Sequence, residues 1–162
     1  MQDNFVIYNE EYTQIKGILS ELKKFTQARH VFITDSEGHC IASTGELDEV
    51  YLNSISSLIA GSIAAVNGIG QMLNNVKAFD SVISESNEQS IYILFINERT
   101  MLVVVYSTES NLGIVKMRSK SALAKLKKVF DTINEKLKDS ISPEDAPFAG
   151  VTDEDIDKIF GD

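Results

Sequence analysis

The sequence predicts an α/β protein of the α+β type, with one five-stranded, mostly antiparallel sheet and helices on both faces. Three observations carry this prediction. Apolar residues recur at three- and four-residue steps in three long segments, as they do in helices. Short β-branched runs lie between those segments, two after the first and three after the second. Short turns join the runs within each group, and turns of this kind connect antiparallel neighbours.

The first half of the chain predicts a helix followed by a hairpin. Residues 10–27 form an amphipathic pattern, and Asn9 before them is a suitable N-cap because its side chain can accept from a free backbone N–H. Residues 31–34 and 40–43 are β-branched or apolar runs around a turn at Gly38. The acidic residues 46–49 then precede the next helix, where negative charge is favourable.

The helix expected over residues 52–73 organises the rest of the chain, because it has two unlike faces and no charged residue. Glycine inside a helix costs about 1 kcal/mol relative to alanine, so small residues on an outer face need a reason. We expect one face on the core and the other against a second surface. The alternatives are burial on both sides and a membrane span. The core-side residues are Leu52, Ile55, Ile59, Ile63, Val66 and Leu73, and the small-residue face holds Ser54, Ser57, Gly61, Ala64, Ala65 and Gly68.

The second half predicts a three-stranded meander, a long helix and a separate tail. Strands are expected at 82–85, 89–96 and 101–106, and the continuous apolar run of the last makes it central. A helix pattern spans 111–139, and the prolines at 143 and 147 mark a linker. The full order is helix, two strands, helix, three strands and helix, with the middle helix alone on one face. We therefore divide the chain into a domain at 1–140 and a linker with a short tail at 141–162.

The tail over residues 152–160 has an amphipathic pattern. Thr152 is a candidate N-cap, and Ile156, Ile159 and Phe160 share one face. Nine residues do not hold a helix alone in water, so this segment is either disordered or bound to another surface.

Composition argues against several functions. The net charge is −9 without a basic run, which disfavours nucleic acid and anionic membrane surfaces as partners. The single Cys40 cannot form an internal disulfide, and no signal peptide is visible, so we expect a cytoplasmic protein. His30, His39 and Cys40 are too few for a metal site, and no phosphate-binding glycine motif occurs. We expect no catalytic residue, metal or cofactor, and no enzyme.

Several segments resemble the roadblock family of small α/β dimerisation modules. Within the family the chain is most similar to the bacterial MglB group, the partners of the Ras-like polarity GTPase MglA. The resemblance covers residues 4–137, and it is carried by residues 8–12, 18–22, 31–38, 41–46, 60–65 and 112–118.

The resemblance implies a homodimer whose third strands pair across a two-fold axis beside the paired central helices. By position, the dimer interface falls on Val82, Ile83, Ser84 and Ala60. One GTPase then binds across the helix pair, so that two copies of this chain serve one GTPase. The implied contact residues are Ser57, Gly61, Ala64, Ala65 and Gly68, and a tail contact falls to Ile156, Ile159 and Phe160.

The resemblance implies a non-enzymatic, GTPase-activating regulator in bacterial polarity or motility, which reshapes the active site of its partner without a finger residue. The alternative is a dimeric scaffold of the same fold that holds a GTPase or a larger assembly without accelerating hydrolysis. A small-molecule sensor is a third hypothesis, which the sequence supports least because it offers no cluster of polar groups for a ligand.

Overall fold

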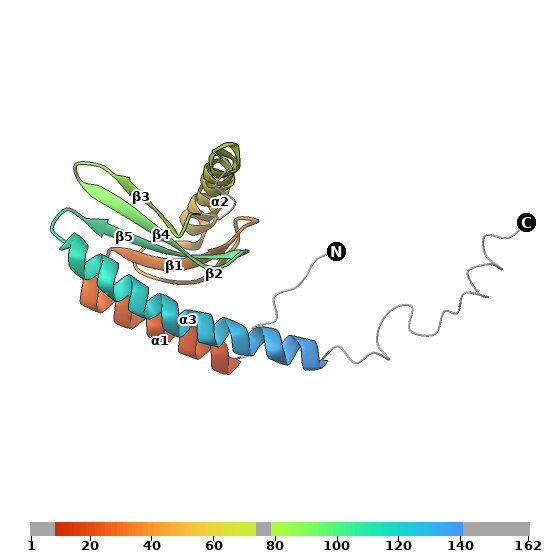
Figure 1. Ribbon diagram of the computed structural model, residues 1–162. Helices are drawn as coiled ribbons and strands as arrows, with labels where there is room; N and C mark the ends of the chain where they lie inside the picture. The colour runs from red at the N-terminus through yellow and green to blue at the C-terminus, as the bar shows by residue number, and fades with distance from the viewer. Residues whose placement is uncertain (1–8, 74–78, 141–162) are drawn as a thin grey trace, which may run out of the picture.

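The computed structural model describes residues 9–73 and 79–140. The sheet has the order β2-β1-β5-β4-β3, and each of its four strand pairs is antiparallel. Helix α2 covers one face, and α1 and α3 lie side by side on the other (Figure 1). The predicted fold class, element order and helix arrangement are confirmed. The elements are α1 Asn9–Thr26, β1 His30–Asp35, β2 Cys40–Thr44, α2 Glu49–Met72, β3 Ser81–Glu85, β4 Gln89–Asn97, β5 Thr100–Ser107 and α3 Leu112–Ser140.

The sheet separates two apolar cores. Strand β5 is buried at every residue except Ser107, as its continuous apolar sequence predicts for a central strand. Side chains alternate between the faces of a strand, so Leu102 and Val104 enter the core under α1 and α3, while Val103 faces α2. The core under α1 and α3 is the larger of the two.

Helix α2 is held on the sheet by one row of side chains. Leu52, Ile59 and Ile63 are buried against the sheet and recur at helical spacing. Asp48 caps the helix, because its carboxylate accepts the backbone N–H of Tyr51 at 2.9 Å. The helix therefore begins at Glu49, before the predicted stretch.

Two sequence expectations need correction at helix ends. Leu73 is expected on the core side of the central helix, but it is 69% exposed. Leu73 is the C-cap of α2, and Ile69 and Met72 in the same last turn are exposed as well, so the large apolar side chains at this end of the helix do not enter the core. Asn9 lies inside α1 rather than before it, so it does not hold the N-cap position expected for it. The predicted linker and tail at 141–162 fall outside the described residues.

Within the described residues, α2 is the one helix long and apolar enough to cross a membrane by length and composition. A helix that packs on its own sheet can pass the same test, and α2 contacts the sheet through Leu52, Ile59 and Ile63.

Candidate functional site: the outer face of helix α2 and the edge strand β3

The small-residue face of α2 points away from the sheet. Ser57, Gly61, Ala64 and Ala65 are exposed, and Gly68 is half-buried. From Leu52 to Leu73 the helix carries no charge that would favour contact with water. The sequence interpretation of a helix with a core face and an open small face matches this arrangement.

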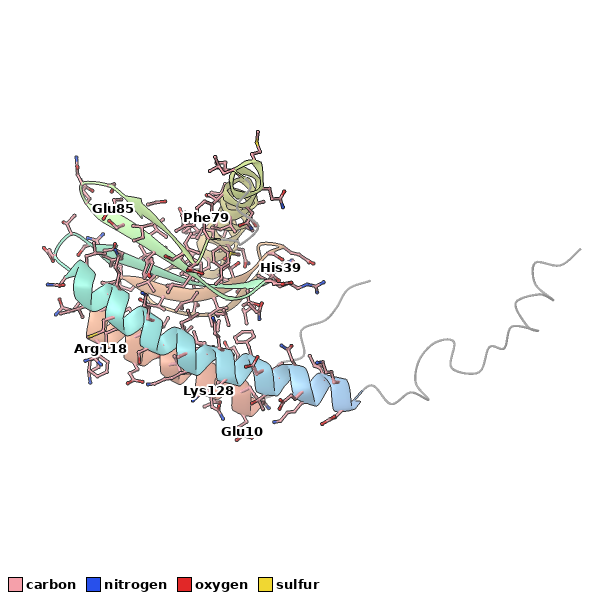
Figure 2. The ribbon with its side chains drawn as sticks, in the orientation of Figure 1. Glu10, His39, Phe79, Glu85, Arg118 and Lys128 are labelled. Atoms are coloured by element: carbon pink, nitrogen blue, oxygen red, sulfur yellow. The ribbon has the colours of Figure 1, made fainter. Side chains whose placement is uncertain are left out.

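The protomer itself does not require two of these glycines. A methyl group built at Gly61 or Gly68 would meet no atom within 4 Å among residues 9–73 and 79–140. Gly70 differs, because the same methyl group would lie 3.3 Å from Cε2 of Phe79, which Figure 2 places between the sheet and the end of α2. Glycine at position 70 therefore has a reason inside the protomer, whereas glycine at 61 and 68 points to a close approach from outside.

Large apolar side chains flank the small face, and they were not predicted from the sequence. Tyr51 is 63% exposed, Leu58 74% and Met72 86%, although all three belong to the same helix. The signal was present in the sequence as the seven-residue spacing Tyr51, Leu58, Ala65, Met72, with Ile69 alongside. Large exposed apolar side chains gathered on one helix are a feature typical of interaction surfaces.

The β1–β2 turn packs against α2 at Ser57, which is part of the small-residue face. Gly38 has a φ of +92°, and a methyl group there would lie 2.7 Å from the Cα of Ser57, so the turn is in direct contact with α2. Asp35 holds the turn, since its Oδ1 accepts the backbone N–H groups of Glu37 at 3.0 Å and His39 at 2.8 Å. The Ser57 hydroxyl donates to the carbonyl of Asn53 at 3.0 Å.

Strand β3 is an edge of the sheet, and β4 is its one partner among the described strands. Val82 and Ile83 are half-buried and pack toward opposite faces, Val82 toward α2 and Ile83 toward α3, while Ser84 is exposed. The free backbone groups of an edge strand can pair with another chain. Ala60, expected at the same interface, is 9% exposed and faces the protomer's own sheet side of α2.

Three residues were considered for chemistry, namely His30, His39 and Cys40. No group of three or more metal-ligating side chains occurs in residues 9–73 and 79–140. Burial raises the pKa of the Cys40 thiol, which disfavours the reactive thiolate. Nδ1 of His30 accepts the backbone N–H of Glu46 at 3.3 Å, and Nδ1 of His39 lies 3.1 Å from the Asp35 carboxylate. Both histidines thus have structural partners in turns.

The fold defines the class of protein. Residues 15–106 match the model of the Roadblock/LC7 domain family, and the chain belongs to this family. No curated protein sequence gives a significant match.

Among solved structures, the chain is similar to MglB proteins. It is 32% identical to Myxococcus xanthus MglB, with a TM-score of 0.74 over 79% of this chain and 96% of that one. The gliding protein MglB from Thermus thermophilus has 24% identity and a TM-score of 0.72, over 80% of this chain and 97% of that one. A structure described as MglB with a tetrameric arrangement has 23% identity and a TM-score of 0.74, over 82% of this chain and 99% of that one. The latter two likenesses concern the fold alone.

The three predicted tail residues, Ile156, Ile159 and Phe160, lie outside the described residues. Of the other predicted positions, five lie on the small-residue face of α2, three lie on the edge strand β3, and Ala60 is buried on α2.

Proposed function

We propose that this protein is a cytoplasmic, homodimeric regulator of a small Ras-like GTPase of the MglA type, and that it accelerates GTP hydrolysis without contributing catalytic residues. The observation that supports this best is the uncharged outer face of α2, where a methyl group at Gly61 or Gly68 would meet no atom of the described residues within 4 Å. The likeness to MglB of Myxococcus xanthus points to the same role.

In this proposal the two copies pair through strand β3, with Val82, Ile83 and Ser84 at the join. The pairing extends the sheet and brings two α2 helices side by side, with Ala60 near their contact. Such a contact is isologous, so each copy presents the same surface to the other. The GTPase then binds across the two outer faces at Ser57, Gly61, Ala64, Ala65 and Gly68. Small side chains there permit a close backbone approach.

The proposed mechanism is conformational. Binding to the loops of the GTPase in their hydrolysis-competent arrangement shifts the population toward that arrangement, because the regulator has a higher affinity for it. No arginine of the chain lies on α2, where the partner would bind, so an arginine finger from this helix is not part of the mechanism.

The deciding experiment is single-turnover GTP hydrolysis by the cognate GTPase with and without this protein. We expect acceleration, and we expect Gly61→Arg to abolish both acceleration and binding. Gly17→Arg is the matched control, because Gly17 is an exposed mid-helix glycine of α1 that also has no neighbour within 4 Å. Equal loss in both variants would contradict the assignment to α2.

Two further results would separate this role from its rival. Binding that is insensitive to the bound nucleotide, without acceleration, would identify a scaffold instead. We also propose that Ile156, Ile159 and Phe160 contact the GTPase at a separate place. Deleting residues 151–162 should then weaken binding or change its nucleotide dependence, and calorimetry with both nucleotide states measures this.

A further inference from the structure

A groove of about 1000 Å³ opens at the edge of the sheet, beside strand β3. It runs from the end of α2, around the start of β3, to α3. Its floor under α3 is apolar, with Ile83 and Leu123 half-buried at the surface and Leu94 beneath them. None of the five residues of the proposed GTPase contact lines this groove.

One wall of the groove is a row of lysines. Lys116, Lys120 and Lys127 are exposed on α3 and lie within about 40° of each other around the helix axis, at 100° per residue. The other charged residues of the lining are Asp80 and Glu98, beside the start of β3 and the β4–β5 turn. No ion pair or hydrogen bond joins these three lysines to another residue of the described chain.

The cations on the side of α3 that faces α1 have partners within the protein. Lys125 bonds to Glu21 of α1 at 2.9 Å, and the Arg118 guanidinium lies 4.4 Å from the centre of the Phe25 ring. The cations facing α1 therefore have partners, whereas those facing the groove are available for an acidic one.

The chain carries a segment with the complementary pattern. Residues 141–162 hold seven of the 24 acidic residues of the protein and one of its 15 basic residues. Within them, Ile156, Ile159 and Phe160 share one helical face, with acidic residues at 153–155 and 157. An acidic helix with one apolar face fits a groove that has an apolar floor and a basic wall.

The segment is also tethered within reach of the groove. Helix α3 runs on for 13 residues from Lys127 to Ser140, which is about 20 Å at 1.5 Å per residue. The 11 residues of 141–151 span at most about 36 Å when extended, so they can bring residue 152 back alongside Lys127. The short tether also raises the effective concentration of the segment at its own groove.

We propose that residues 152–160 bind as a helix in the groove between α3 and β3 of their own chain. The apolar residues Ile156, Ile159 and Phe160 then cover Ile83 and Leu123, and the acidic residues face the three lysines. The bound segment is withheld from any other surface, so a partner that takes it must compete with the groove. This inference does not depend on the proposed GTPase regulation.

The test uses the absence of tryptophan from the sequence. In full-length Phe160→Trp protein, the new side chain is the sole tryptophan and reports on the tail alone. We expect blue-shifted emission and weak quenching by acrylamide. Both should be independent of protein concentration, because the segment binds its own chain. Emission typical of a fully exposed indole would overturn the proposal, and a signal lost on dilution would overturn it by showing binding to a second copy instead.

Two neighbouring lysines locate the contact. Lys127 lines the groove, whereas Lys128 is exposed and lies on the side of α3 away from the sheet (Figure 2). We expect Lys127→Glu to red-shift the emission and to increase quenching several-fold, and Lys128→Glu to leave both unchanged. Equal responses of the two variants would overturn the assignment to this groove. Circular dichroism of both variants checks that the fold is retained.

Discussion

Replacement of Gly61 by alanine should have opposite effects on the stability of the protomer and on its affinity for the GTPase. The added methyl group meets nothing within 4 Å in the protomer, so the fold loses no contact. Alanine lowers the entropy of the unfolded chain and favours helix by about 0.5–1 kcal/mol. For a chain of this length we expect unfolding about 1–4 °C higher, since 1 kcal/mol corresponds to roughly 2–4 °C at this size.

The same substitution should weaken the binding of the GTPase. If the GTPase backbone approaches Gly61 closely, an extra methyl group overpacks the contact at a cost of about 1–3 kcal/mol. This range corresponds to about 5- to 150-fold weaker binding, because each 1.4 kcal/mol is about tenfold. Differential scanning calorimetry and titration calorimetry, at one fixed protein concentration, measure the two effects.

Two other glycines serve as controls. Gly17→Ala should give the same stabilisation without any loss of binding, because Gly17 is equally uncrowded and lies on α1. Gly70→Ala should stabilise less, since its methyl group would lie 3.3 Å from the Phe79 ring. Unchanged GTPase affinity in Gly61→Ala, together with unchanged affinity in Gly61→Arg, would refute the reasoning.

Three further predictions concern the sheet and its cores. Leu126→Ala removes a fully buried side chain between α3 and the sheet, and it should lower the free energy of unfolding by about 2–5 kcal/mol in urea titrations. Proline in place of Ile83 or Ser84 removes one backbone N–H of β3. Along an edge strand, alternate N–H groups point away from the neighbouring strand, so one of these two N–H groups faces the open edge. We expect proline at that position to dissociate the dimer in sedimentation while the fold is kept. Burial lowers the pKa of His30 below 6.5, so the unfolded chain binds this proton more readily. The contribution of His30 to the free energy of unfolding should therefore be fully present above pH 6.5 and should fall as the pH drops toward the folded pKa. Urea titrations at about pH 7.5 and 5.5 measure this difference, and His30→Asn should make it smaller.

The local patterns of the sequence predicted most of the fold. The strands at 81–85 and 89–97 begin and end within one residue of expectation, because alternating and β-branched runs depend on local geometry. The long uncharged helix and its open small face followed from helical spacing alone. The pairing of β1 with β5 is different, because it joins segments about 70 residues apart and no local pattern encodes it.

Residue spacing alone predicted the site only where it lies on one helix face, and the positions on β3 followed from the family resemblance. The glycines of α2 could be singled out from the sequence, since glycine is unfavourable in a helix whatever surrounds it. The exposure of Tyr51 and Leu58 was missed, because an apolar side chain on a helix normally belongs to a core, although their seven-residue spacing is visible in the sequence. The groove under β3 requires knowledge of where α3 lies across the sheet, which residue spacing does not provide.

The path of α2 across the sheet has a mechanical consequence. This helix lies in the connection between β2 and β3, the two outermost strands, and it supplies 24 residues of that connection. Four strand spacings amount to about 19 Å, and such a helix is about 36 Å long. The helix also touches the turn between β1 and β2, where Gly38 lies against Ser57, and it packs on the central strand β5 through Val103. A force applied to α2 therefore reaches the centre of the sheet as well as its margin.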